Sequence, residues 1–255
     1  MNKEEIYKLR KTCSDYFKKH HYQEALNSYY ELIKQYSSSE KVDNFSEIFK
    51  TMFRQGVCYF LLNNYENASQ CFKNSDELYI KNNLENENLY GKNMAYLSYC
   101  ILINAKSEND MKFGLELSLK AREIFEKNKI SDDDENAVLF SSLGYYHFKK
   151  GDFESSKKEL ERAEHFIKKH QHKKNLVNMF DLYYLAQIYL KENRFDDAIN
   201  KFTESHNLSE ELKAGDIEYH ITCLENISNL YYKLERDELG EKFEKKLKEY
   251  KQSKQ

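Results

Sequence analysis

The stretch YYLAQIYLKENRFDDAINKF, residues 183–202, decides the fold because an earlier stretch repeats its pattern. The earlier copy is SSLGYYHFKKGDFESSKKEL, residues 141–160. Each begins with a leucine and a small residue, continues through a ring and a polar turn, and ends in a second amphipathic segment. Such self-similarity at a fixed period is the sequence signature of stacked repeats, so we interpret each stretch as one helix hairpin.

Further copies begin at Thr12, Arg54 and, in a weaker form, Ile227. In all five copies a small residue in the first helix is followed by a small residue in the second helix 12 positions later. The pairs are Cys13 with Ala25, Gly56 with Ala68, Gly144 with Ser156, Ala186 with Ala198, and Ser228 with Gly240. Small side chains let two helices approach closely, and a constant offset predicts the same helix crossing in every copy.

The small residue of the first helix recurs after 43, 88, 42 and 42 positions, so the gap of 88 leaves room for one more hairpin. The segments LYGKNMAYLSYCILI and MKFGLELSLKAREIF supply its two helices, with either Ala95 or Ser98 as the small residue. The sequence therefore predicts an all-α chain of about six hairpins with a period of about 42 residues. We expect them at about residues 5–36, 45–82, 88–127, 135–170, 176–213 and 217–250, as a single solenoid over residues 1–255.

These residues resemble the tetratricopeptide repeat family, whose pattern contains W-x₂-L-G-x₂-Y, A-x₃-F and a late proline. The matching positions are Leu143-Gly144, Leu185-Ala186-x-x-Tyr189, Ala68-x₃-Phe72 and Ala198-x₃-Phe202. The chain has no tryptophan or proline, and its period exceeds the family's 34 residues by about two helical turns. The resemblance implies a right-handed α-solenoid, and the charged stretch at residues 241–255 is typical of a C-terminal capping helix.

Long, proline-poor repeats rich in Tyr and Asn are also similar to the peptide-binding domains of Gram-positive cytoplasmic pheromone receptors, the Rap, NprR, PlcR, Rgg and arbitrium-receptor group. That resemblance implies a quorum-sensing receptor or transcriptional regulator. Such regulators usually begin with a helix-turn-helix, but here the first hairpin is expected within ten residues of Met1. We therefore expect no separate DNA-binding domain in this chain, and no room for the N-terminal bundle that carries the catalytic residue of Rap-type phosphatases.

Composition excludes several other functions. The net charge of −3 gives no basic field for nucleic acid, and no apolar run approaches the roughly eighteen residues of a membrane span. We expect a cytoplasmic protein with reduced thiols, because the start lacks a signal peptide and the five cysteines are scattered. No nucleotide, hydrolase or metalloprotease motif occurs, so we expect no enzyme and no cofactor. His165, His170 and His172 lie among lysines, which disfavours a metal site.

The predicted ligand site is the concave groove lined by the first helices. Positions three before, one after and four after each small residue form one stripe on a helix. The predicted peptide contacts on and beside this stripe are Arg10, Phe53, Tyr96, Tyr99, Tyr145, Tyr183, Tyr184, Gln187, Asn226 and Asn229. Rings can bury peptide side chains while amides bind peptide backbone. The receptor resemblance implies that role above all for Asn226 and Asn229. The alternative is that the rings are ordinary core, which we favour for Phe17, Phe60 and Phe148.

Two functions follow from this site. The first is a receptor module in which a short peptide in the groove changes the solenoid's curvature or its pairing into a homodimer. The second is a scaffold or adaptor that holds a protein partner without switching. An enzyme is a third hypothesis, but no residue pattern supports it.

Overall fold

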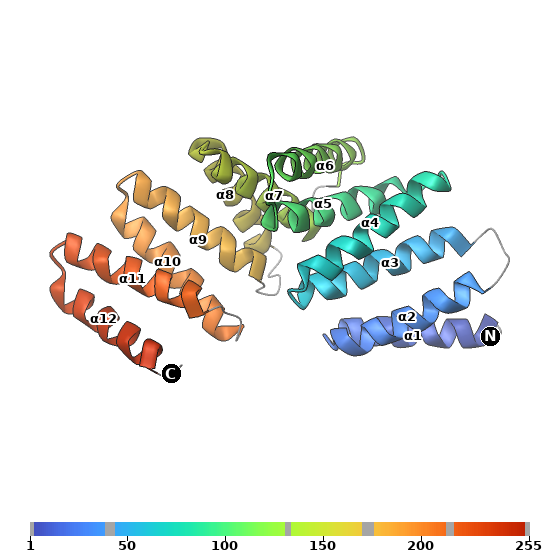
Figure 1. Ribbon diagram of the computed structural model, residues 1–255, viewed down its shortest axis with the longest axis horizontal. Helices are drawn as coiled ribbons and strands as arrows, with labels where there is room; N and C mark the ends of the chain where they lie inside the picture. Colours follow the sequence, from blue (N-terminus) through green and yellow to red (C-terminus); the bar gives the residue numbers. More distant parts are fainter. Residues whose placement is uncertain (1–2, 39–43, 131–133, 170–175, 213–216, 253–255) are drawn as a thin grey trace. The chain divides into compact units, whose positions relative to one another are not determined.

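The computed structural model describes residues 3–38, 44–130, 134–169, 176–212 and 217–252 (Figure 1). These residues form twelve α-helices and include no strand, so the predicted all-α repeat fold is confirmed. The helices are α1 (Lys3–Lys18), α2 (Tyr22–Ser37), α3 (Asn44–Leu61), α4 (Tyr65–Lys81), α5 (Glu87–Ile103), α6 (Glu108–Lys127), α7 (Asp134–Lys150), α8 (Phe153–Lys169), α9 (Leu176–Lys191), α10 (Phe195–Glu211), α11 (Ile217–Lys233) and α12 (Asp237–Gln252). They pair in chain order into six hairpins, and residues 241–252 of the stretch expected to cap the repeats belong to α12, the second helix of the last hairpin.

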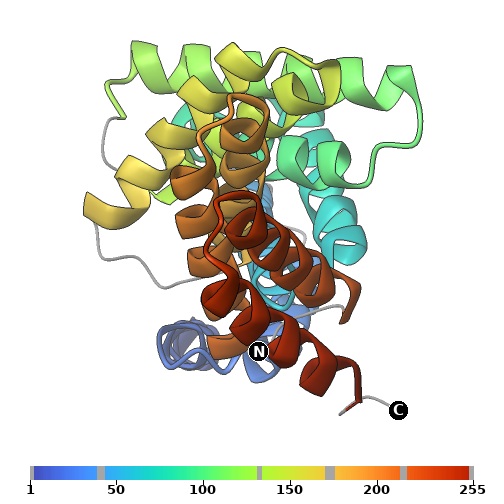
Figure 2. The same cartoon turned by 90° about the vertical axis from the view of Figure 1, so that its left-hand side faces the viewer.

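The chain divides into two compact units, residues 1–142 and 143–255, with the boundary inside α7. In unit 1 each helix from α1 to α6 packs on the next one in the chain. In unit 2 the same holds from α8 to α12, and Figure 2 shows the last hairpin, α11 and α12, in orange to red. Because successive helices pack together, neighbouring hairpins within each unit bury their apolar faces on one another. None of the helices in the described ranges is both long and apolar enough to cross a membrane.

The turns inside five hairpins share one backbone conformation. His20, Asn63, Gly151, Asn193 and Glu235 all have a left-handed φ, between 57° and 77°. Each lies seven residues after the small residue of its first helix. At α3, Asn63 N–H donates to the Phe60 carbonyl and Asn64 N–H to the Tyr59 carbonyl, a Schellman cap. Asn63, Gly151 and Asn193, whose residue types adopt a left-handed φ most easily, therefore end three of the first helices.

Close packing explains the small residues. A Cβ atom added to Gly56 would lie 2.5 Å from Cε1 of Phe72, and one added to Gly144 would lie 2.6 Å from Cγ of Leu160. Both partners belong to the second helix of the same hairpin and are fully buried. The two helices of a hairpin therefore touch at these glycines, and there is no space for a side chain.

The third hairpin follows the same plan in a longer form. The Ser98 hydroxyl donates to the Gly114 carbonyl at 2.7 Å, as Ser156 does to Gly144 at 2.8 Å. Ser98 is thus the small residue of α5, and the separation from its partner in α6 is 16 rather than 12. The four extra residues lie in the turn and the first turn of α6, which begins with a Ser107–Asp110 capping box instead of a left-handed residue.

Candidate functional site

Two adjoining hollows open on the first helices of unit 1. The smaller, of about 220 Å³, is lined by Arg10, Cys13, Tyr29, Leu32, Glu47, Lys50, Thr51 and Arg54. The larger, of about 390 Å³, is lined by Lys50, Phe53, Arg54, Asn86, Asn88, Leu89, Lys92 and Glu135. Lys50 and Arg54 border both, so we treat the pair as one surface and call it the cationic wall.

The repeat places the lysines of the cationic wall. Lys50 precedes Gly56 by six residues, and Lys92 precedes Ser98 by six, so both occupy the same position of their hairpins. Lys50, Phe53 and Arg54 are spaced at i, i+3 and i+4 and therefore share one face of α3.

Charged side chains of both signs line the cationic wall. Glu47 lies 2.6 Å from the Arg10 guanidinium and 3.0 Å from the Lys50 ammonium, so one carboxylate serves two cations. Lys92 pairs with Glu135 at 3.3 Å, and Arg54 lines the smaller hollow together with Tyr29. Four cations and two carboxylates are thus among the described residues that line the two hollows. The side chains of Arg10, Lys50 and Glu47 are 31–44% exposed, and such ion pairs hold each other weakly. They can exchange partners with an incoming anion.

The predicted rings of unit 1 gather in one aromatic cluster. Phe53 and Tyr96 are each 7% exposed and Tyr99 only 3%. Tyr96 stacks on Phe72 with ring centroids 5.4 Å apart and contacts Phe53 at 5.9 Å. These rings join hairpins two and three, and Phe53 lines the larger hollow of the cationic wall. Their main visible role is packing, and their role as ligand contacts stays a prediction.

In unit 2 four predicted residues lie close together on α7 and α9. The Tyr184 ring contacts Tyr145 at 5.3 Å, and Tyr183 contacts Tyr184 at 5.7 Å. Gln187 lies one turn after Tyr183 on the same face of α9, and both side chains are half-buried. Burial raises the pKa of Tyr183 and Tyr184, so both hydroxyls are neutral hydrogen-bonding groups at ordinary pH.

The remaining predicted residues lie elsewhere. Arg10 lines the smaller hollow of unit 1. Asn226 and Asn229 lie on α11, where the Asn226 amide donates to the Thr222 carbonyl at 2.7 Å and Asn229 is exposed. One donor of Asn226 is therefore occupied by its own helix. The assignment of both asparagines to a peptide site stays a prediction.

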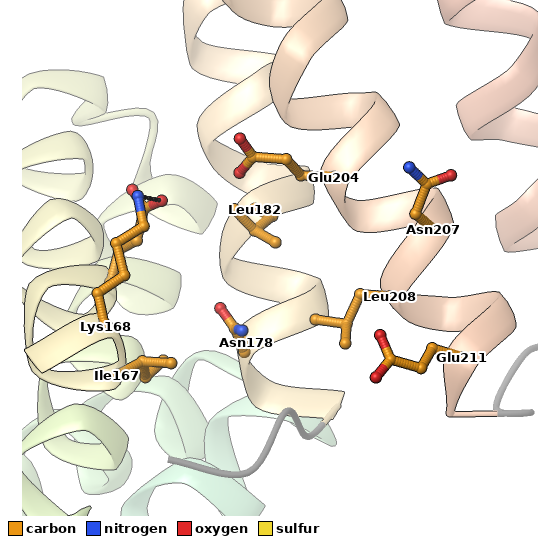
Figure 3. Close-up of a pocket in the computed structure, with 9 residues that line it drawn as sticks. Ile167, Lys168, Asn178, Leu182, Glu204, Asn207, Leu208 and Glu211 are labelled. Carbon is orange, nitrogen blue, oxygen red and sulfur yellow. Dashed lines mark ion pairs between the residues drawn. The ribbon is translucent and has the colours of Figure 1, made fainter. Parts of the chain in front are cut away.

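A further hollow, of about 300 Å³, lies in unit 2 between α8, α9 and α10 (Figure 3). It is lined by Glu164, Ile167, Lys168, Asn178, Leu182, Glu204, Asn207, Leu208 and Glu211. Glu164 lies 2.6 Å from Lys168 and from Lys201. Burial opposes ionisation, but the hydrogen bonds from both lysines hold the pKa of Glu164 below its ordinary value. This hollow has an apolar floor and an acidic rim, opposite in charge to the cationic wall.

Sequence reasoning missed Lys50, Arg54 and Lys92 because scattered charges were interpreted as solvated faces. The sequence does hold one signal for this site, because Lys50 and Lys92 occupy equivalent positions in their hairpins. That equivalence is visible only when Ser98 is taken as the small residue of the third hairpin. Of the histidines considered for a metal, His165 is exposed on α8, and His170 and His172 lie outside the described residues. Within the described ranges, no group of three or more His, Cys, Asp or Glu residues could hold a metal ion.

Six helix hairpins with small residues at each helix contact and hollows on the helix surface define a tetratricopeptide-like repeat protein, a class that binds ligands on its helices. Residues 50–75 match the family model of the tetratricopeptide repeat. At the level of sequence, no curated protein matches the chain.

Solved structures extend this similarity to nearly the whole chain. NprR in complex with its cognate peptide NprX superposes with a TM-score of 0.64 at 15% identity, covering 97% of this chain and 67% of NprR. A Rap protein complexed with competence and sporulation factor superposes with a TM-score of 0.60 at 14% identity, covering 99% of this chain and 76% of the Rap chain. BtubC from P. vanneervenii superposes with a TM-score of 0.61 at 10% identity, covering 96% of this chain and 91% of BtubC. These matches confirm the resemblance to tetratricopeptide repeats and to proteins of the Rap and NprR kind, and at such low identities they show the fold alone.

Proposed function

We propose that this chain is a peptide-binding repeat module and that the cationic wall of unit 1 binds an acidic group of its ligand. The gathering of four cations, Arg10, Lys50, Arg54 and Lys92, on the lining of two adjoining hollows is the observation that carries the proposal. Carboxylates bind guanidinium and ammonium groups through charge-assisted hydrogen bonds, which are about twice as strong as neutral ones. An aspartate, a glutamate or a terminal carboxylate fits this chemistry.

The rest of the cationic wall suits a peptide rather than a free anion. Phe53 and Leu89 supply apolar surface next to the charges. Asn86 and Asn88 supply amides, and the Asn86 side-chain oxygen already accepts the Leu89 N–H at the start of α5. Its NH₂ group can donate to a peptide carbonyl. The larger hollow, at about 390 Å³, falls in the usual size range of ligand pockets.

The comparison structures support the same class of ligand, because NprR and the Rap conjugation gene regulator of plasmid pLS20 are each seen in complex with a peptide. In this proposal the chain is the ligand-binding domain of a bacterial peptide-pheromone receptor or regulator, acting in the cytoplasm of a Gram-positive cell. Within unit 2, Tyr183, Tyr184 and Gln187 are proposed as further ligand contacts, since they present half-buried rings and an amide together.

The test is a titration of the full chain with matched synthetic peptides that carry a free or an amidated C-terminus and acidic or amide side chains. We expect the acidic forms to bind more tightly, and the preference to shrink with added salt. Lys50→Gln and Arg54→Gln should each weaken binding of the acidic form about tenfold or more, the usual worth of a charged hydrogen bond.

The control is Lys120→Gln, which removes the same charge from an exposed position on α6 outside both hollows. Equal affinity for acidic and neutral peptides would reject the cationic wall as the anion site. Binding confined to a folded protein partner would instead favour the scaffold function.

A further inference from the structure

Two buried histidines meet where α10, α11 and α12 come together in unit 2. His206 of α10 is 1% exposed and His220 of α11 is 4% exposed. Their Nδ1 atoms lie 3.2 Å apart, and the two rings are nearly perpendicular. Histidines are rarely so fully buried, and two in direct contact need a defined arrangement of protons.

The neighbouring groups assign those protons. The Lys246 ammonium lies 3.2 Å from His206 Nε2 and can only donate, so this nitrogen accepts and the neutral ring carries its proton on Nδ1. That proton is then donated to His220 Nδ1. His220 in turn carries its own proton on Nε2, which donates to the Ser209 hydroxyl at 2.8 Å. The result is one directional chain of hydrogen bonds, from Lys246 of α12 through both rings to α10.

An added proton breaks this chain at either ring. On His206 Nε2 it would point at the Lys246 ammonium, and on His220 Nδ1 it would point at the N–H of His206. Glu210 is the carboxylate at hand, with Oε1 3.5 Å from His206 Nε2 and Oε2 3.6 Å from Lys246 Nζ. On α12 the Tyr250 ring packs 4.9 Å from the His220 ring, and on α11 the Tyr219 ring lies 6.2 Å away. A protonated His206 and Lys246 would therefore share this one carboxylate, and two adjacent positive charges would face a single negative one.

We propose that the His206–His220 pair is a pH-sensitive lock, which holds the last hairpin, α11 and α12, against α10 at neutral pH and loosens it on acidification. The acid state separates Lys246 from His206 and so detaches α12 first. Nothing in this inference depends on the peptide site, because it concerns only the packing of the last three helices.

The direction of the pH dependence follows from the two states of His206. Burial, and then the Lys246 charge, lower the pKa of His206 from 6.5 to about 4 in the packed state. The opened state therefore binds more protons between these values, and the packing free energy is complete above about pH 6.5 and falls as the pH drops toward 4. For one such group the opening equilibrium constant should be about 30-fold larger at pH 5 than at pH 7.5.

The test is hydrogen–deuterium exchange of the full chain at pH 7.5 and pH 5, corrected for the intrinsic pH dependence of exchange. We expect amides of α11 and α12 to open about 30-fold more often at pH 5, relative to amides of α9 as the internal reference. The titration of each imidazole, followed by NMR, should show His206 titrating well below its ordinary range.

Lys246→Gln is the informative variant, because its side chain is 44% exposed and its loss should not unfold the chain. It removes a charge that lowers the pKa of His206, so the pH-dependent opening should become smaller. Lys245→Gln, one residue earlier with an 80% exposed side chain, is the matched control and should behave as the wild type. Equal opening of α11 and α12 at both pH values, or the same response in both lysine variants, would overturn the proposal.

Discussion

Gly144→Ala tests the close helix contact on which the whole fold depends. The new Cβ would lie 2.6 Å from both Cγ and Cδ2 of Leu160, about 1 Å closer than carbon atoms normally approach. Leu160 is fully buried, so it can move only by displacing other core residues. Overpacking of this kind lowers the free energy of unfolding by about 1–3 kcal/mol, and the better helix propensity of alanine raises it by about 1 kcal/mol. We expect a net loss of about 0–2 kcal/mol in the free energy of unfolding.

Gly240→Ala is the control, since it lies in the same unit and gains the same helix propensity. Its Cβ would lie 2.7 Å from the Tyr232 ring, but that side chain is 37% exposed and can turn outward. We expect this variant to be neutral or up to about 1 kcal/mol more stable. Urea denaturation followed by circular dichroism measures both. If Gly144→Ala proves as stable as Gly240→Ala, the helices do not meet at Gly144 as described.

Three further outcomes are expected. Circular dichroism of the whole chain should show a helix content far above the roughly one third typical of globular proteins, and a strong strand signal would contradict the fold. Ala186→Leu should lose about 1–3 kcal/mol in thermal melts, since Ala186 is fully buried, and an unchanged melt would mean that this position is not a helix contact. Asn226→Ala combined with Asn229→Ala should weaken peptide binding by about 0.5–1.5 kcal/mol for each amide that no longer hydrogen-bonds the peptide backbone. Unchanged affinity in calorimetry would remove both asparagines from the site.

The repeat could be predicted from sequence because its signal is local. Two small residues 12 positions apart mark the contact between the two helices of one hairpin. Because this pair recurs five times, it predicts where the helices and the turns between them lie. The left-handed residues Asn63, Gly151 and Asn193 carry a signal that is equally local, since Gly and Asn adopt this conformation most easily. His20 and Glu235 take the same φ without that signal.

The candidate site was harder to predict because it depends on which charges meet in space. Glu47 of α3 forms ion pairs with both Arg10 of α1 and Lys50 of α3. The spacing of residues within one hairpin does not indicate a carboxylate shared between two hairpins. The aromatic residues failed as a guide for a different reason. A tyrosine on a first helix, such as Tyr96, satisfies the pattern equally well as a groove contact or as a ring packed between hairpins.

The third hairpin shows how this architecture absorbs a change in length. Its four extra residues add about one turn of helix, so the side chains beyond them return to nearly the same face. The Ser98–Gly114 hydrogen bond survives while the spacing in the sequence changes from 12 to 16. What is constant from hairpin to hairpin is thus the contact and not the number of residues between its partners. Insertions of about four residues should be tolerated in the other hairpins at this place, whereas insertions of about two would turn the buried face of the second helix toward water.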